Sequence, residues 1–155
     1  VVHMPDFLRM CDARPHQTLR SEGILHEFNP GPERIAAFVS YQWCGRSHPD
    51  PHLRQLAILQ RVFIRAAANC ITVEADLIST VTFHKTPVRT MEMRDSMAWC
   101  LWYDYFGVPQ PGLEGEAQHL FDRSQFDAAI SSLAGYIFRC RYFLVLAPPV
   151  VHEDG

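Results

Sequence analysis

Ile35–Tyr41 (IAAFVSY) is a short apolar run bounded by turn-forming residues, and it is the stretch that decides the fold. Two further runs of the same kind are Ala98–Phe106 (AWCLWYDYF) and Tyr142–Ala147 (YFLVLA). Strands that are apolar without alternation are typical of a parallel sheet that is buried on both faces. We therefore predict three parallel strands at the centre of an α/β domain.

Amphipathic helices are predicted between these strands. Asp50-Pro51 is a favourable helix start, and apolar residues then recur at helical spacing to about Ala68. A second predicted helix, capped by Asp122 or Ser124, has an apolar face formed by Phe126, Ala129, Ile130, Leu133 and Ile137. Right-handed crossovers favour the flavodoxin-like order, in which the first strand lies between the other two. The predicted fold class is a flavodoxin-like three-layer sandwich with a short central parallel sheet.

The remaining segments set the predicted domain limits. Residues 1–32 are rich in proline, histidine and aspartate, and we expect an irregular lead-in with a short strand at Gly23–Phe28. The α/β domain is expected at 33–150, followed by a tail at 151–155. Because the chain starts with valine rather than methionine and ends at Gly155, we expect both ends to be cut from a longer protein, and the end soon after the third strand implies that the fold is truncated at its C-terminus.

An insertion is expected at about 70–97, between the first helix and the second strand. Alternating and β-branched residues favour an extended or hairpin-like structure over Ile71–Lys85. A short helix is predicted over Thr90–Met97. This insertion would lengthen an otherwise compact domain.

The composition excludes several classes of protein. The net charge of −3 argues against a nucleic-acid surface built on bulk charge. No apolar run reaches the roughly 18 residues of a membrane span, and no secretory signal pattern starts the chain. Five widely spaced cysteines suit reduced thiols better than a disulfide framework. We therefore expect a cytoplasmic protein without a membrane span or a nucleic-acid partner.

The three strands and the residues around them resemble Toll/interleukin-1-receptor (TIR) domains. Ala37–Tyr41 is similar to the opening strand of that family, and Trp102–Asp104 is similar to its second strand, which ends in an aspartate. Pro111-Gly112 lies where the family has Pro-Gly in its BB loop, and Arg141–Pro148 resembles its third strand. Cys140 and Ala147 replace the serines that are usual there.

Two longer segments resemble a divergent TIR-like branch. Tyr41–Trp43 with His48–Pro51, and Trp102–Phe106 with Val108–Gln110, are similar to a TIR-like group common in algal and other protist sequences. The second pair of segments also resembles the W-x-D-x-x-x-I-x-Q signature of fungal heterokaryon-incompatibility domains, which are themselves TIR-like. The resemblance covers about residues 35–150.

The resemblance implies a signalling domain whose longer parent binds and cleaves NAD or a related nucleotide. NAD would be a substrate, and no covalently bound cofactor is expected. The ligand would lie in a crevice at the carboxyl ends of the strands. The residues expected there are Tyr41, Gln42, Trp43, Asp104 and Phe106.

The catalytic carboxylate of TIR enzymes has no counterpart in this sequence. The family carries a glutamate on the helix after the third strand, whereas Glu153 lies in a short tail and Glu114 and Glu116 belong to the BB-like loop. No catalytic residue is therefore assigned, and the chain itself is expected not to hydrolyse NAD efficiently.

Structural roles compete with these site assignments. Aromatic residues at strand ends, such as Trp43, are often core or rim packing, and an aspartate such as Asp104 often caps a loop. The spacing of Cys44, His48 and His52 matches metal ligands on a helix, but the prolines between them forbid that helix, so no metal site is predicted.

Two other functional classes compete with this interpretation, and the residues disfavour the second. A non-catalytic assembly module would use the sheet and the BB-like loop for homotypic contacts, and an open sheet edge would favour self-association. A receiver domain is disfavoured because it needs an acidic pair after its first strand, where this chain has Ser40–Trp43.

Overall fold

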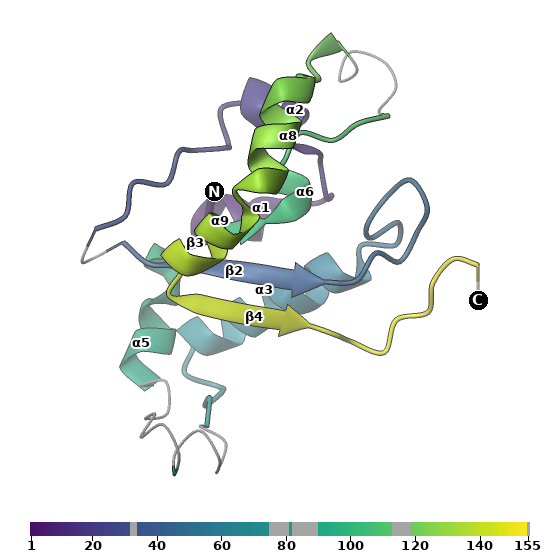
Figure 1. Cartoon of the computed structure of the whole chain (residues 1–155). Coiled ribbons are helices and arrows are strands. Elements are labelled where there is room, and N and C mark those ends of the chain that lie inside the picture. Colours follow the sequence, from purple (N-terminus) through teal and green to yellow (C-terminus); the bar gives the residue numbers. More distant parts are fainter. Residues whose placement is uncertain (32–33, 75–80, 82–89, 113–118, 155) are drawn as a thin grey trace.

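The structure is a computed structural model of the 155-residue chain, and it describes residues 1–31, 34–74, 81, 90–112 and 119–154. It is a mixed α/β fold built around one four-stranded sheet (Figure 1). Among the helices that these residues form, none is both long enough and apolar enough to cross a membrane.

The sheet contains β1 (Val2–His3), β2 (Ala36–Tyr41), β3 (Cys100–Tyr103) and β4 (Tyr142–Leu146). Its strand order is β1-β3-β2-β4. β2 pairs in parallel with β3 on one side and with β4 on the other, whereas β1 adds to β3 in antiparallel orientation. The prediction that the first of the three apolar strands lies between the other two is therefore confirmed.

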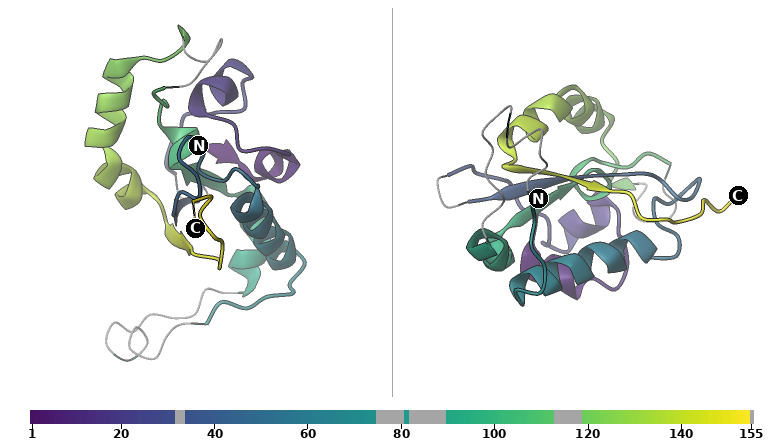
Figure 2. Two further views of the ribbon diagram at one scale, coloured as in Figure 1. Left: turned by 90° about the vertical axis from the view of Figure 1, so that its right-hand side faces the viewer. Right: turned by 90° about the horizontal axis from the view of Figure 1, so that it is seen from below.

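Helices lie on both faces of this sheet, which makes the arrangement compatible with a three-layer α/β fold (Figure 2). α3 and α1 cover one face, and α8 and α9 lie over the other. The helical elements are α1 (Met4–Arg9), α2 (His16–Ser21), α3 (Arg54–Ala67), α5 (Thr90–Arg94), the 3-10 helix η1 (Asp95–Ala98), α6 (Asp104–Gly107), α8 (Arg123–Ser131) and α9 (Leu133–Arg139).

The main core lies between the sheet and α3. Alternate residues of β2, Ala37 and Val39, face this side, while Phe38 faces the other. Leu56, Leu59 and Phe63 recur at helical spacing on α3, and all three are buried against them. The predicted amphipathic helix is therefore confirmed, although it begins at Arg54.

Asp50 explains where α3 begins. Its buried carboxylate accepts hydrogen bonds from the backbone N–H groups of Arg54 (2.9 Å) and Leu56 (2.8 Å). His48 Nδ1 in turn accepts the N–H of Asp50 at 3.0 Å. Asp50 thus satisfies free amides in the first turn of α3 although it lies four residues before Arg54. This is possible because the chain turns at Leu53, which has a positive φ of 55°.

Residues 1–31 are more regular than the expected irregular lead-in. They contain β1, α1 and α2, and their Val2, Met4, Phe7 and Leu19 are fully buried in the main core. The short strand expected at Gly23–Phe28 is reduced to a single bridge between Leu25 and Val2. The helices α1 and α2 have six residues each, which is too few to show an apolar periodicity in the sequence. Helices of this length are stable only when tertiary packing holds them.

The second apolar run contains a shorter strand than predicted. Of Ala98–Phe106, only Cys100–Tyr103 is strand, and α6 follows it directly. The Val108 N–H donates to the Asp104 carbonyl at 2.7 Å, which closes this helical turn. The same aromatic residues suit a buried strand and a buried helical turn, so composition did not separate the two.

The later elements agree more closely with prediction. Asp122 caps α8 through the backbone N–H groups of Ser124 and Gln125, but the single predicted helix is divided into α8 and α9 at Ser132. The helix predicted over Thr90–Met97 is found as α5 followed by η1. Most of the extended segment predicted over Ile71–Lys85 falls outside the described residues.

Candidate functional site

The carboxyl ends of β2 and β3 bring Tyr41 and Asp104 together, as the sequence predicted for its candidate site. The Tyr41 hydroxyl donates a hydrogen bond to the Asp104 carboxylate, and the Tyr41 ring stacks on Tyr103 with 4.0 Å between centroids. Asp104 also accepts the backbone N–H of Tyr105 at 2.5 Å. The carboxylate therefore joins the two strand ends and accepts one free amide of the first turn of α6.

Burial sets the protonation of this pair. Desolvation raises the pKa of Asp104, while the hydrogen bonds from Tyr41 and Tyr105 act in the opposite direction. Desolvation and the neighbouring Tyr103 and Asp104 raise the pKa of Tyr41 far above its usual value. Tyr41 is consequently a neutral donor at physiological pH, and it favours the charged form of Asp104.

The other three predicted site residues differ in position. Trp43 is 40% exposed, and its ring meets Tyr105 edge-on at 6.0 Å. The exposed Gln42 uses its backbone carbonyl to accept Gln55 Nε2 at 2.8 Å. Phe106 is fully buried and stacks on Tyr103, so it packs in the core next to the end of β3. Trp43 is the aromatic side chain of the five that is open to solvent.

The C-terminal tail returns to the same edge of the sheet. Glu153 accepts the backbone N–H of Arg46 at 2.6 Å and donates its own N–H to the Cys44 carbonyl at 2.9 Å. Asp154 forms an ion pair with Arg46 at 3.0 Å. Sequence analysis gave no position for Glu153, because no periodic pattern surrounds it.

Gly45 allows this close approach of the tail. A Cβ atom at Gly45 would lie 2.8 Å from the Glu153 carboxylate and 2.5 Å from the Pro51 ring. Any side chain there would displace the tail or the turn that precedes α3.

The described residues contain no group of three or more histidine, cysteine or acidic side chains that could hold a metal ion. His48 is occupied at both ring nitrogens, since Nε2 lies 2.9 Å from the Ala13 carbonyl and Nδ1 accepts from Asp50. The buried Cys44 contacts Gln55 Nε2 at 3.2 Å. This cluster orders the entry to α3.

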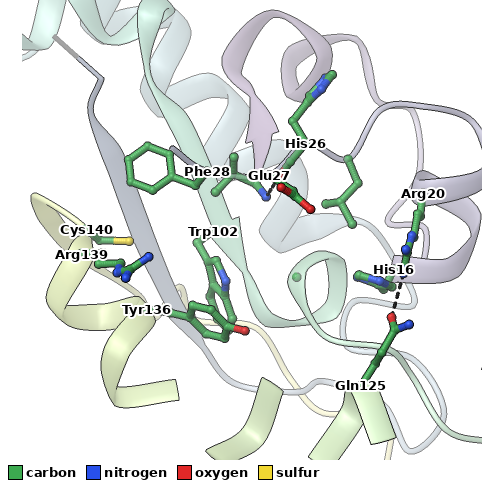
Figure 3. Close-up of a pocket in the computed structure, with 13 residues that line it drawn as sticks. His16, Arg20, His26, Glu27, Phe28, Trp102, Gln125, Tyr136, Arg139 and Cys140 are labelled. Atoms are coloured by element: carbon green, nitrogen blue, oxygen red, sulfur yellow. Dashed lines mark hydrogen bonds between the residues drawn. The ribbon is translucent and has the colours of Figure 1, made fainter. Parts of the chain in front are cut away.

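Two pockets lie away from the strand ends, beside α8 and α9. The first, of about 500 Å³, is lined by residues of the N-terminal segment, β3 and α8–α9 (Figure 3). The second, of about 700 Å³, lies between α2 and residues 119–125. His16, Arg20 and Gln125 contribute to both. The sequence offered no signal for these pockets because their walls come from segments more than a hundred residues apart.

Both carboxylates at the strand ends have hydrogen-bond partners. Asp104 accepts a hydrogen bond from Tyr41, and Glu153 accepts one from the backbone N–H of Arg46. A carboxylate has further acceptor positions, so each group can also accept a hydrogen bond from a ligand. Comparison with protein-family models, with curated protein sequences and with solved structures found no match for this chain.

Proposed function

We propose that the chain is a TIR-like signalling module that binds NAD or a related nucleotide at the carboxyl ends of β2, β3 and β4. The observation that carries this proposal is the arrangement of Tyr41, Trp43 and Asp104 at the carboxyl ends of the parallel strands β2 and β3, where Tyr41 bonds Asp104 and Trp43 meets the adjacent Tyr105. In open α/β sheets, ligands bind outside the carboxyl ends of the strands at the switch point, which in this strand order lies between β2 and β4 and so next to Tyr41 at the end of β2.

Each of the three side chains has a distinct role in this proposal. The exposed Trp43 ring stacks on the nicotinamide or adenine ring, as aromatic side chains do with flat ligands. Asp104 accepts a hydrogen bond from a ribose hydroxyl, because a carboxylate has acceptor sites beyond the two used by Tyr41 and Tyr105. Tyr41 keeps that carboxylate in place.

Cleavage of NAD is not part of this proposal for the chain. A TIR-type hydrolase needs a glutamate on the helix after the third strand, and no described residue occupies such a helix. We expect this chain to bind without releasing nicotinamide.

The three tryptophans provide the test. Their indole N–H signals, resolved by ¹⁵N NMR and assigned with single Trp→Phe variants, report on the strand edge (Trp43), the core (Trp99) and the α8–α9 face (Trp102). Titration with NAD is expected to shift the indole N–H signal of Trp43 and to leave the signal of Trp99 unchanged. Asp104→Asn should weaken the apparent affinity about tenfold, which is the loss expected for one hydrogen bond to a charged group.

A matched variant distinguishes binding from folding. Asp127→Asn changes an exposed carboxylate on α8 and should leave the titration unchanged. Nicotinamide release, measured on the same samples, should stay at the rate of buffer. A Trp43 signal that does not move at millimolar NAD, in protein with a native Trp99 signal, would reject the proposal.

The second candidate function is homotypic assembly, with a second copy of the chain as partner. β4 pairs with β2 on one side, and no other described strand pairs with its opposite edge. Phe143 and Val145 on β4 are 52% and 71% exposed, and Phe138 on the adjacent α9 is 90% exposed. An open edge strand with apolar side chains favours pairing with another chain.

Sedimentation velocity across a concentration series tests this candidate. The chain is expected to associate, and Val145→Lys should shift the distribution toward monomer because a charged side chain disfavours edge pairing. Ser131→Lys, on the exposed side of α8, is the control for added charge. A concentration-independent monomer for the unmodified chain would exclude assembly through β4.

A further inference from the structure

The pocket of about 500 Å³ has an aromatic floor (Figure 3). Trp102 on β3 and Tyr136 on α9 lie with their ring centroids 5.2 Å apart, and Phe38 stacks on Trp102 with 4.5 Å between centroids. Trp102 is only 6% exposed, and it lines the pocket. A wall of this kind accepts a flat apolar group, and the volume is in the range of small-molecule sites.

The floor is flanked by cationic side chains. Arg20 and Arg139 line opposite ends of the pocket in Figure 3. Among the ion pairs that the described residues form, none involves either of these arginines. Glu27 is the acidic residue in the lining, and burial raises the pKa of the Cys140 thiol to about 11, so this cysteine adds no negative charge. The pocket therefore has a positive balance of charge.

Arg20 is oriented by a neutral partner. Its Nη1 donates to Gln125 Oε1 at 2.7 Å, a contact that joins α2 to α8. An amide oxygen holds a guanidinium in place without neutralising it. The remaining donors of Arg20 are thus left for an anion, which a guanidinium can bind with two parallel hydrogen bonds.

His16 adds an unused acceptor beside Arg20. Its Nδ1 lies 2.9 Å from the Phe106 carbonyl, and because a carbonyl can only accept, Nδ1 carries the proton. Nε2 is buried and has no hydrogen-bond partner among the described residues. Desolvation lowers the pKa of His16, and the neighbouring Arg20 acts in the same direction. Neutral His16 therefore offers Nε2 to an O–H or N–H group of a ligand.

We propose that this pocket binds a small organic anion in which a planar ring is joined to a phosphate or carboxylate group. The ring lies against Trp102 and Tyr136, and the anionic group binds Arg20. The site shares no residue with the strand-end site of the proposed function, so either can fail without the other.

Three probes separate the parts of this recognition: 5′-AMP (ring and phosphate), adenosine (ring alone) and inorganic phosphate (charge alone). AMP is expected to shift the Trp102 indole N–H signal in a saturable manner and to leave Trp99 unmoved. Adenosine and phosphate should each bind at least about tenfold more weakly, because each lacks one of the two contacts.

The variants test the role of Arg20. Arg20→Gln should weaken AMP binding about tenfold, which corresponds to the loss of one charge-assisted contact. Arg9→Gln, which changes an exposed arginine on α1 that is paired with Asp6, should have no effect. The native position of the Trp99 signal verifies folding in both variants.

Three results would overturn the proposal. The first is a Trp102 signal that does not respond to millimolar AMP. The second is adenosine binding as tightly as AMP, and the third is AMP binding that Arg20→Gln leaves unchanged. A shift of Trp43 without a shift of Trp102 would also reject this pocket, while supporting the strand-end site.

Discussion

The two faces of the sheet are covered to very different extents. On the α3 face, α1, α3 and the N-terminal segment close a large continuous core around Ala37, Val39 and Leu101. On the α8–α9 face, the buried cluster consists of Phe38, Trp102, Val108 and Ala129. The first face accounts for most of the burial that stabilises the fold. The second keeps a pocket and exposed apolar residues, which are the features expected of an interaction surface.

The helices show the same contrast. On α3, the apolar residues Leu56, Leu59 and Phe63 are buried at helical spacing. On α8 and α9, Ile130 and Ile137 remain 50% and 37% exposed although they lie on the predicted apolar face. Apolar periodicity thus identified both helical segments, but it did not determine how completely the second one is covered.

The largest effect is expected at Phe7, which tests whether the N-terminal segment belongs to the core. Phe7 is fully buried and packs edge-on against Phe63 of α3 with 6.4 Å between ring centroids. Phe7→Ala should lower the free energy of unfolding by about 3–5 kcal/mol, because it leaves a cavity in a closed core. Urea unfolding followed by circular dichroism measures this loss.

Phe138→Ala is the matched change on the other face. Phe138 is 90% exposed, so its removal should alter the free energy of unfolding by less than about 0.5 kcal/mol. If both variants lost similar stability, the distinction between a closed and an open face would be wrong.

The parallel part of the fold could be predicted from sequence because its signals are local and strong. Three apolar runs, the helical spacing of the apolar residues of α3 and the cap at Asp122 each depend on a few neighbouring residues, whereas Asp50-Pro51 placed the start of α3 too early, since the helix begins at Arg54. The N-terminal segment could not, because α1 and α2 are short and are ordered by contacts such as Phe7 with Phe63. Long-range packing of this kind leaves no periodic trace in the sequence.

The residues of the candidate site also differ in whether the sequence could predict their positions. Tyr41 and Asp104 were expected together because the carboxyl ends of neighbouring parallel strands meet. Phe106 was placed in the same crevice on the assumption that the strand continued, whereas the chain turns into α6 and buries the ring. The pocket around His16 and Arg20 was missed because its walls come from distant segments.

A second, smaller effect is expected from the two aspartates that cap α3 and α8. Asp50 is 1% exposed and accepts two backbone N–H groups. Asp50→Ala should lower the free energy of unfolding by about 2 kcal/mol, because it leaves buried donors without partners. Asp122→Ala removes an exposed cap and should cost clearly less. Thermal unfolding of both variants compares the two faces, and a larger loss at Asp122 would contradict the comparison.

The strand-end pair predicts a pH dependence. Burial raises the pKa of Asp104 above its ordinary value of 3.8, so the folded chain holds this proton to higher pH than the unfolded chain does. Stability contributed by the protonated group is therefore lost as pH rises through the raised pKa. Asp104→Asn removes this loss and should therefore gain stability relative to the unmodified chain as pH rises above the ordinary pKa of 3.8.

Tyr41→Phe should increase the loss of stability that occurs as the pH rises. Removing the phenol takes away a hydrogen bond that lowers the pKa of Asp104, so the pH-dependent loss becomes steeper. Urea unfolding at several pH values measures both variants. Parallel stability curves for all three proteins would show that Asp104 is not desolvated as described.

Small effects of opposite sign are expected at two glycines of the open face. A Cβ atom at Gly107 would lie 2.9 Å from the Trp102 ring, whereas one at Gly135 on α9 meets no atom within 4 Å. Gly107→Ala should destabilise the chain by about 1 kcal/mol and displace the indole that floors the pocket. Gly135→Ala should stabilise it by about 0.5–1 kcal/mol, since alanine favours a helix interior. The Trp102 indole N–H signal should move in the first variant alone, because the added methyl group of Gly107→Ala meets that ring and the one of Gly135→Ala meets no neighbour.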